Sequence, residues 1–215
     1  GYNTVNERSL GGQIMNGTKE NILLTALELF SRSGYEAVSV SDIAGRLGMT
    51  KSALYKHYKN KRDIFDSITA RMEQRDAERS RLFELPEEAM TEGGEDYSAA
   101  SLRQLIEFSK AQLRYWTEDE FASAFRRLLT LEQYRDGEMR AMYQQYLAGG
   151  PLGYVADLLS AHGLPNAERE AMEFYAPMFL FYSLYDGAED KSSVIAAADA
   201  HFESFLQKWR GADRG

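Results

Sequence analysis

The sequence predicts an all-α protein with a small amino-terminal domain of the helix-turn-helix type and a larger carboxy-terminal helical bundle. Three helix-start signals occur close together within residues 39–63. Elsewhere, apolar residues recur at the i, i+3 and i+4 spacing of helices, without strand-like alternation. The length of 215 residues is sufficient for one small and one larger domain. We therefore divide the chain into residues 1–16, 17–63 and 64–215.

Residues 39–61 have the pattern of two short helices joined by a tight turn that contains glycine. Ser39 is placed to cap the first helix, and Asp42, three residues later, completes a capping box. Gly48 ends this helix, and Thr50 caps the next one, whose outward face is polar and basic. This arrangement is typical of a helix-turn-helix, in which the second helix enters the major groove of DNA.

One helix on each side completes the first domain. Thr18 is expected to cap the preceding helix, which Gly34 ends, while residues 1–16 lack helical periodicity and are expected to form a flexible arm. Asn60 is expected to cap the following helix, which continues through the charged residues 71–79 toward the second domain. Movement of this connecting helix would couple the two domains.

The second domain is expected to consist of further helices separated by glycine- and proline-containing breaks. They are placed at about residues 101–116, 118–133, 137–147, 151–161, 166–186 and 191–209. An acidic segment at residues 87–96 separates them from the connecting helix. Pro177 lies inside the most apolar helix and is expected to kink it, because proline removes a backbone hydrogen bond.

Four short motifs give the first domain a resemblance to a known family. They are L-F-x-x-x-G-Y at residues 29–35, V-S-D-I-A at 40–44, L-Y-K-H-Y at 54–58 and K-N-K at 59–61. In order and spacing these resemble the amino-terminal domain of the tetracycline-repressor (TetR) family, over residues 18–68. The resemblance implies an all-helical homodimeric repressor that binds an inverted-repeat operator in double-stranded DNA and releases it when a small-molecule effector binds the body.

The candidate DNA contacts lie on and around the second helix of the motif. They are Ser39, Ser41, Thr50, Lys51, Ser52, Ala53, Tyr55, Lys56, His57 and Lys61. Residues at the start of a recognition helix reach base edges, so Lys51 is expected to donate to guanine and Ala53 to contact a thymine methyl group. The resemblance implies that Tyr55, His57 and Lys61 contact the DNA backbone.

Composition separates the two domains by charge and narrows the classes of function. Residues 17–63 contain eight Lys or Arg against five Asp or Glu, although the whole chain has a net charge of -8. A basic domain on an acidic body is typical of a protein that meets a polyanion with one face. Cysteine is absent, which excludes disulfides and thiolate metal sites. We expect a cytoplasmic protein with no membrane partner, no cofactor and no metal.

Large side chains with polar tips are concentrated in the first half of the second domain. They suit a pocket for an apolar or aromatic small molecule. The candidate lining residues are Phe108, Gln112, Tyr115, Trp116, Phe125, Tyr134, Met142, Tyr143, Tyr146, Met178 and Tyr182. An aromatic stripe at helical spacing also suits an ordinary hydrophobic core, so both interpretations stay open for each residue.

The last two helices are apolar on more than one face and are expected to pair with the same helices of a second subunit. The candidate dimerisation residues are Tyr175, Phe179, Ile195, Ala198, Phe202, Phe205 and Trp209. A two-fold dimer would place two recognition helices about 34 Å apart, one helical turn of DNA.

Two other classes of function remain to be separated from a ligand-responsive regulator. A DNA-binding dimer whose body recognises a protein partner, or has no effector, would show a solid core and an exposed apolar patch, whereas a cavity would favour a small molecule. An enzyme is disfavoured, because the sequence contains no Gly-rich phosphate loop, metal cluster or nucleophile–base set.

Overall fold

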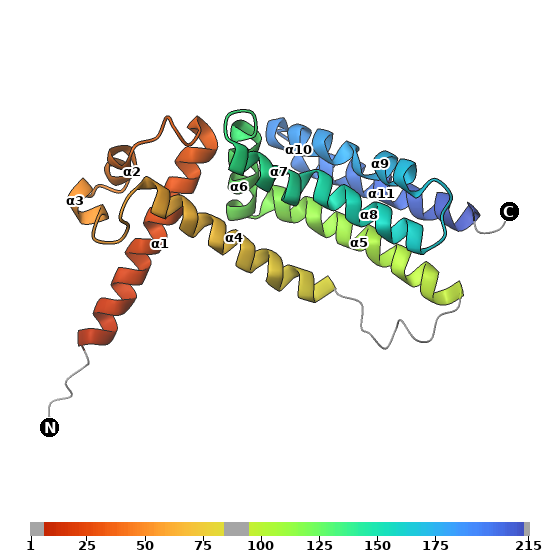
Figure 1. Cartoon of the computed structure of the whole chain (residues 1–215), viewed down its shortest axis with the longest axis horizontal. Coiled ribbons are helices and arrows are strands. Elements are labelled where there is room, and N and C mark those ends of the chain that lie inside the picture. Colours follow the sequence, from red (N-terminus) through yellow and green to blue (C-terminus); the bar gives the residue numbers. More distant parts are fainter. Residues whose placement is uncertain (1–6, 84–94, 213–215) are drawn as a thin grey trace, which may run out of the picture.

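The computed structural model describes residues 7–83 and 95–212, with side chains placed for residues 17–79 and 102–209, and this part of the chain forms helices and no strands (Figure 1). The helices are α1 (Glu7–Ser33), α2 (Val40–Arg46), α3 (Lys51–Leu54), α4 (Lys61–Phe83), α5 (Glu95–Glu118), α6 (Glu120–Glu132), α7 (Gly137–Leu147), α8 (Gly149–Ala161), α9 (Ala167–Tyr175), α10 (Pro177–Gly187) and α11 (Lys191–Ala212). The predicted all-α class is confirmed.

The first domain packs α2 and α3 against α1 and the first half of α4. Its core consists of fully buried side chains from all four helices, including Phe30, Ile43, Leu54, Phe65 and Ile68. Burying these side chains offsets the low intrinsic stability of helices as short as α2 and α3. The first domain therefore holds α3 in a defined orientation on the surface.

Local capping sets where the short helices begin. The Ser39 hydroxyl accepts a hydrogen bond from the Asp42 N–H at 3.2 Å, and the Asp42 carboxylate accepts one from the Ser39 N–H at 2.7 Å. The Thr50 hydroxyl accepts from the Ala53 N–H at 3.1 Å. Both predicted caps are confirmed, and Gly48, with φ of +65°, makes the turn between the helices.

The structure corrects two predicted helix boundaries. α1 begins at Glu7 and not at Thr18, so residues 7–16 are helical and are not a flexible arm. A helix lengthens at small cost once nucleated, and the glycines in this segment lower its helicity without ending it. α5 begins at Glu95, inside the predicted acidic break. Residues 1–6 and 84–94, the rest of the predicted arm and of that break, lie outside the described residues.

The predicted helix at residues 166–186 is two helices. α9 ends at Tyr175 and α10 begins at Pro177, with Ala176 between them. Proline has no N–H to donate and sterically opposes a continuous helix, but it is well tolerated in the first turn. The expected kink is thus a change of helix, which allows α9 and α10 to follow different directions.

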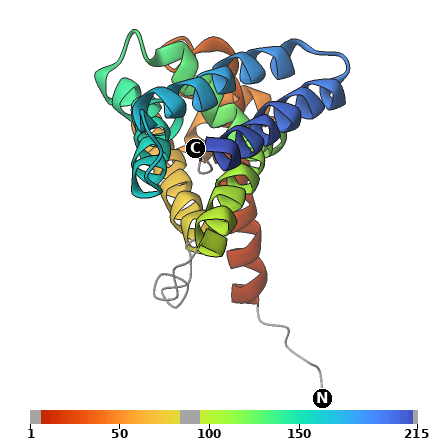
Figure 2. The same cartoon turned by 90° about the vertical axis from the view of Figure 1, so that its right-hand side faces the viewer.

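The body is a bundle whose long helices lie along one another, with α6 between them and the first domain (Figure 1). Viewed from its end, α8 and α11 lie on opposite sides of the bundle (Figure 2). An aromatic cluster joins α9 to α11: the Phe174 ring lies 5.2 Å from Phe202 and 5.3 Å from both Phe205 and Trp209, centroid to centroid. The His201 Nε2 atom is 2.9 Å from the Phe174 carbonyl oxygen. This cluster is the core that holds the last helices together.

Two polar contacts join the first domain to the body. The buried Glu132 carboxylate, at the end of α6, accepts a hydrogen bond from the Tyr35 N–H at 3.0 Å. The Arg62 guanidinium, at the start of α4, donates two hydrogen bonds of 2.7 Å to the Glu138 carboxylate at the start of α7. Tyr35 lies in the turn directly after α1, and Glu132, Arg62 and Glu138 lie on helices, so these contacts restrict how the domains turn relative to each other.

Replacing Gly34 with alanine is expected to lower the free energy of unfolding by about 1–3 kcal/mol. Gly34 has φ of +87°, and an added Cβ would lie 2.5 Å from the Glu132 Oε1 atom, the acceptor of the contact to Tyr35. Chemical denaturation would measure the loss. Gly153 is the control, because it is helical with open space at its Cβ, so Gly153→Ala should be neutral or stabilising. Equal stability of the two variants would contradict the role of the Gly34 turn.

Candidate functional site

The surface of α3 and the turn after it is polar and basic, as the sequence predicts. Leu54 and Tyr58 are buried in the first domain, which turns the opposite face outward. The exposed predicted DNA contacts here are Lys51, Ser52, Tyr55 and Lys56, while Ala53 and His57 are half-buried. The Lys51 ammonium lies 5.8 Å from the centre of the Tyr55 ring, so the two side chains present one combined surface.

The hydroxyl groups of Ser39 and Thr50, which are also predicted DNA contacts, differ in whether their proton already has an acceptor. The Ser39 hydroxyl both accepts from the Asp42 N–H and donates to the Asp42 carboxylate at 2.6 Å, so its proton already has a partner. These hydrogen bonds lower the pKa of Asp42. The Thr50 hydroxyl accepts only from Ala53, which leaves its proton for a phosphate, and Ser41 is exposed. The structure therefore corrects the view of Ser39 as a phosphate donor.

Lys61 is held by the first domain itself. Its ammonium donates to the Tyr35 carbonyl oxygen at 2.9 Å and lies 4.2 Å from the centre of the Tyr35 ring. An ammonium has three donors, so this geometry leaves capacity for a phosphate while fixing the position of the charge. Because Tyr35 also donates its N–H to Glu132, this residue links the Lys61 charge to the body.

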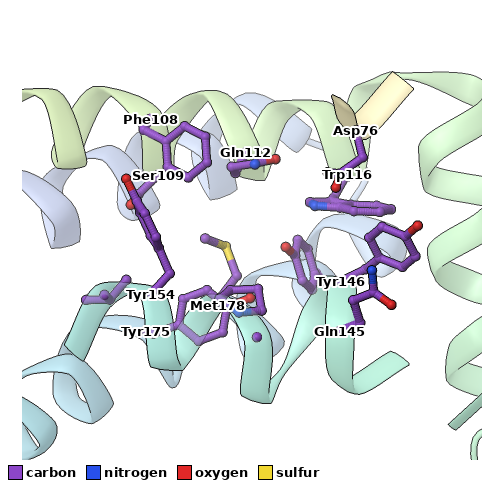
Figure 3. Close-up of a pocket in the computed structure, with 14 residues that line it drawn as sticks. Asp76, Phe108, Ser109, Gln112, Trp116, Gln145, Tyr146, Tyr154, Tyr175 and Met178 are labelled. Atoms are coloured by element: carbon purple, nitrogen blue, oxygen red, sulfur yellow. The ribbon is translucent and has the colours of Figure 1, made fainter. Parts of the chain in front are cut away.

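The body contains a cavity of about 460 Å³ between α5, α7, α8 and α10 (Figure 3). Its lining residues are Asp76, Phe108, Ser109, Gln112, Trp116, Gln145, Tyr146, Gly150, Pro151, Tyr154, Val155, Tyr175, Met178 and Tyr182. The volume and the mixture of aromatic walls with a few polar groups are typical of small-molecule sites. The predicted residues that line it are Phe108, Gln112, Trp116, Tyr146, Met178 and Tyr182.

The other predicted lining residues are placed elsewhere. Tyr134 is 85% exposed, whereas Phe125, Met142 and Tyr143 belong to the hydrophobic core. Tyr115 lies against α4, with the Arg79 guanidinium 3.9 Å from the centre of its ring. Neighbouring residues along a helix point in directions about 100° apart. Composition does not indicate which of these directions faces the cavity, so some of the predicted lining residues were assigned wrongly.

Sequence reasoning missed the charged group of the cavity and part of its wall. Asp76 lies on the connecting helix α4, among residues interpreted as solvent-exposed ion pairs. Within the described part of the chain it forms no hydrogen bond or ion pair. Tyr154 of α8 was also missed; its ring packs edge-on against Phe108, with centroids 6.0 Å apart. Only the packing of α4 against the body shows that Asp76 faces the aromatic residues of the cavity, so no local sequence signal could have identified it.

Burial determines the ionisation of the groups that line the cavity. It raises the pKa of Asp76, and the nearby positive charge of Arg79 opposes that rise. It also raises the pKa of Tyr146 to about 12, with a smaller contribution from the negative charge of Asp76. The Tyr175 hydroxyl donates to the Leu147 carbonyl oxygen at 2.8 Å. The tyrosines are therefore neutral hydrogen-bonding groups at physiological pH.

The structure places most of the predicted dimerisation residues in the core of the chain itself. Ala198, Phe202, Phe205 and Trp209 are buried in the core of their own subunit. Tyr175 lines the cavity, Ile195 is half-buried against the core, and Phe179 is exposed beside the Tyr143 ring. The apolar spacing along α11 marks a buried face, and that face packs against α5, α9 and α10 of the same chain.

A different set of apolar side chains is exposed on the last helices. Leu180 and Leu184, one turn apart on α10, are 58% and 48% exposed, and Met172 of α9 is also exposed. On the neighbouring α11, the small residues Ala197 and Ala200 are exposed. Clustered exposed leucines beside small residues are typical of a surface that packs against another protein.

Comparison with known proteins identifies the first domain. Residues 22–68 match the model of the bacterial regulatory proteins of the tetR family, which covers the helix-turn-helix and the start of α4. The amino-terminal domain belongs to the TetR family. The TetR-type domain is 43% identical over 51 residues to the HTH-type transcriptional regulator AcrR of Shigella flexneri, a match that spans 24% of each chain. It is 41% identical over 54 residues to the class C tetracycline repressor protein of Escherichia coli, spanning 25% of each.

The chain thus spans only about a quarter of the length of these two relatives. The fold extends further than the sequence similarity. A transcriptional regulator from Rhodococcus sp. Rha1 has a solved structure that matches 88% of this chain and 96% of its own, with a TM-score of 0.56 and 20% sequence identity. The TetR-type domain and the helical body are thus arranged as one known fold.

The described residues, 7–83 and 95–212, contain no helix with the length and apolar character needed to cross a membrane. Among the same residues, no three His, Asp or Glu side chains are grouped so as to hold a metal ion.

Proposed function

We propose that the protein is a homodimeric transcription regulator that binds an inverted-repeat operator through its TetR-type domain and releases it when a small molecule occupies the cavity. The observation that carries the proposal is the course of α4, one helix that reaches from the core under the recognition helix to the wall of the cavity. Phe65 and Ile68 are buried in the first domain, and Asp76 lines the cavity.

The second half of α4 is attached to the body at several points. The Arg75 guanidinium pairs with Asp119 at 2.7 Å, and the same carboxylate caps α6 by accepting from the Ala122 N–H at 2.8 Å. One turn further, Arg79 donates to the Gln112 side chain at 3.4 Å, and Gln112 lines the cavity. A ligand that changes the position of Gln112 or Asp76 would therefore move α4 as a unit.

Ligand control of DNA binding follows if the ligand prefers one of two positions of α4. It then shifts the population toward that position by its difference in affinity for the two. The contacts of the first domain with α6 and α7, through Tyr35–Glu132 and Arg62–Glu138, would transmit the same movement. The separation of two recognition helices in a dimer would change, and both half-sites could no longer be bound together.

Selection of bound sequences from random duplex DNA at near-physiological salt tests the proposal. We expect enrichment of an inverted repeat whose half-sites are about one helical turn apart, because a two-fold dimer contacts two equivalent half-sites. Retention of DNA without sequence enrichment, lost steeply with added salt, would mean charge-driven binding and would contradict the proposal.

Lys51→Ala should relax base preference at one position of each half-site, costing about 1–3 kcal/mol for the preferred base. Tyr55→Phe should instead weaken binding to all sequences alike, because it removes a predicted backbone contact. Repeating the selection and titrating the enriched duplex measures both effects. Arg140, an exposed cation on α7, is the control, and Arg140→Ala should leave sequence preference unchanged. Sequence-independent losses from both Lys51 and Tyr55 variants would refute the assigned roles.

The exposed apolar residues of α10 also support a second function for the body, recognition of a different protein partner. Leu180 and Leu184 suit either a second copy of the chain or such a partner. The two are distinguished by the mass of the purified protein in sedimentation. A dimer supports the proposed regulator, whereas a monomer at micromolar concentration favours the protein partner.

A further inference from the structure

The cavity in the body has one formally charged lining residue, and that residue is acidic. We propose that the ligand of this cavity is a monovalent aromatic organic cation, held by the Asp76 carboxylate and the surrounding aromatic rings. This deepens the proposed function, on which it rests for its regulatory meaning, by naming the chemical class of the effector.

Asp76 lies at one end of the cavity, beside Trp116 and Tyr146 (Figure 3). Among the side chains described, those of residues 17–79 and 102–209, none donates a hydrogen bond to its carboxylate or forms an ion pair with it, although the positive charge of Arg79 is near enough to act on it. A half-buried carboxylate is costly when unpaired, because it has lost part of its hydration without gaining a replacement. A cationic ligand would supply the missing partner at the same time as it fills the cavity.

The rest of the wall favours a cation as well. The rings of Trp116, Tyr146, Tyr154 and Tyr182 line the cavity, and aromatic faces attract cations electrostatically. The body already pairs its own cations with rings of this kind: the Arg126 guanidinium lies 4.9 Å from the centre of the Tyr182 ring. A ligand with a positive charge near Asp76 and a ring directed toward Phe108 and Tyr154, at the other end in Figure 3, would use both features.

An anionic ligand would meet the opposite environment. No Lys, Arg or His is among the residues that line the cavity. Two guanidinium groups that contact lining residues have other partners: Arg79, whose positive charge acts on Asp76, lies over the Tyr115 ring and donates to Gln112. Arg126 pairs with Asp186 at 2.7 Å. An anion would lie close to the Asp76 carboxylate, and no cationic side chain among the lining residues would balance its charge. The cavity should therefore bind a cationic ligand more tightly than an anionic ligand of the same shape.

The uncharged polar groups of the lining determine which hydrogen-bonding substituents the ligand can carry. Gln112, Gln145 and Ser109 line the cavity, and each can donate or accept a hydrogen bond. The Tyr175 hydroxyl is already donating to Leu147, so it can only accept from a ligand. One or two polar substituents on an aromatic body are therefore compatible with the site, whereas a second charge has no partner.

Calorimetric titration of the purified 215-residue protein with three probes that share one ring system tests the proposal. The probes are the trimethyl(naphthylmethyl)ammonium cation, naphthylmethanesulfonate and neutral naphthylmethanol. All three carry the same ring system, so differences in affinity report the charge. We expect the cation to bind at least about tenfold more tightly than the other two, a difference of about 1.4 kcal/mol.

Variants at Asp76 assign that preference to the carboxylate. Asp76→Asn should weaken binding of the cation about tenfold and leave the neutral probe unchanged, while Asp76→Glu should retain the preference. Asp157, an exposed acid on α8 without a hydrogen bond or ion pair in the described residues, is the matched control for loss of charge. Asp157→Asn should bind like the wild type. Because Asp76 is unpaired, its removal should not destabilise the fold, which circular dichroism checks.

Equal or tighter binding of the sulfonate, no binding of the cation at millimolar concentration, or an Asp76→Asn variant with wild-type affinity would each overturn the proposal. These outcomes are separate from those of the DNA selection. An inverted repeat that is enriched and then released by the sulfonate or the neutral probe would preserve the proposed regulator and refute the cation. Absence of an enriched repeat would refute the regulator whatever the cavity binds.

Discussion

Replacing Leu180 with arginine is expected to convert the proposed dimer into monomers and to remove high-affinity binding to the proposed operator. Leu180 is the most exposed leucine on α10, and Leu184, one turn further along the same helix, is also exposed. At a two-fold interface each substitution is introduced twice. Two arginines brought into an apolar contact without acceptors would cost about 2–5 kcal/mol or more, because each charge is dehydrated and unpaired.

The effect on DNA should exceed the effect of any single contact to a base. A dimer binds its second half-site at a high effective concentration, which raises the affinity for DNA by a factor of about 10²–10⁴. A monomer loses this factor although its recognition helix is intact. Weak binding to an isolated half-site should remain, and it should keep the same base preference.

Sedimentation velocity and titration with the enriched duplex measure both parts of this prediction. Tyr134→Arg is the control for placing a charge on the surface, since Tyr134 is highly exposed just after α6 and is not on α10 or α11. It should leave the mass and the affinity unchanged. A Leu180→Arg protein that stays dimeric at nanomolar concentration would place the interface on another surface.

Phe174→Ala should lower the free energy of unfolding by about 3–5 kcal/mol, the range for removing a large buried aromatic side chain. Phe174 is fully buried, and its ring contacts Phe202, Phe205 and Trp209. The substitution would leave a void where α9 meets α11. Because adjacent aromatic rings can relax only partly into that space, the loss includes both transfer and cavity contributions.

Denaturation at fixed protein concentration measures the change, since the stability of a dimer depends on concentration. Tyr134→Ala serves again as a control and should change the stability by less than about 0.5 kcal/mol. A loss from Phe174→Ala no larger than that of the control would contradict the assignment of this aromatic cluster as the core of the body.

Much of the first domain could be predicted because the signals that define it are local. Ser39 with Asp42, and Thr50 with Ala53, act across three residues, so their chemistry is visible in the sequence. Leu54 and Tyr58 face inward as their spacing predicts. The extension of α1 to Glu7 was missed because continuing an existing helix requires no start signal of its own.

The body was predicted less completely because its signals are ambiguous. Phe202 and Trp209 lie on an apolar face, but that face packs within the subunit and the candidate interface is formed by Leu180 and Leu184. Both faces of α10 are apolar, so hydrophobic spacing could not assign one to the core and the other to a partner. Asp76 belongs to the charged stretch at residues 71–79, and its charge alone did not indicate that it lines the cavity.

Sequence alone determines the all-α class, the helix-turn-helix and the polar, basic character of the surface around α3, because caps, turns and helical periodicity act over a few residues. The tertiary structure decides which aromatic side chains line a cavity, which apolar face is exposed and which charge has no partner. These properties depend on the rotation and approach of helices distant in the chain. Contacts of that kind are set by the packing of the whole bundle.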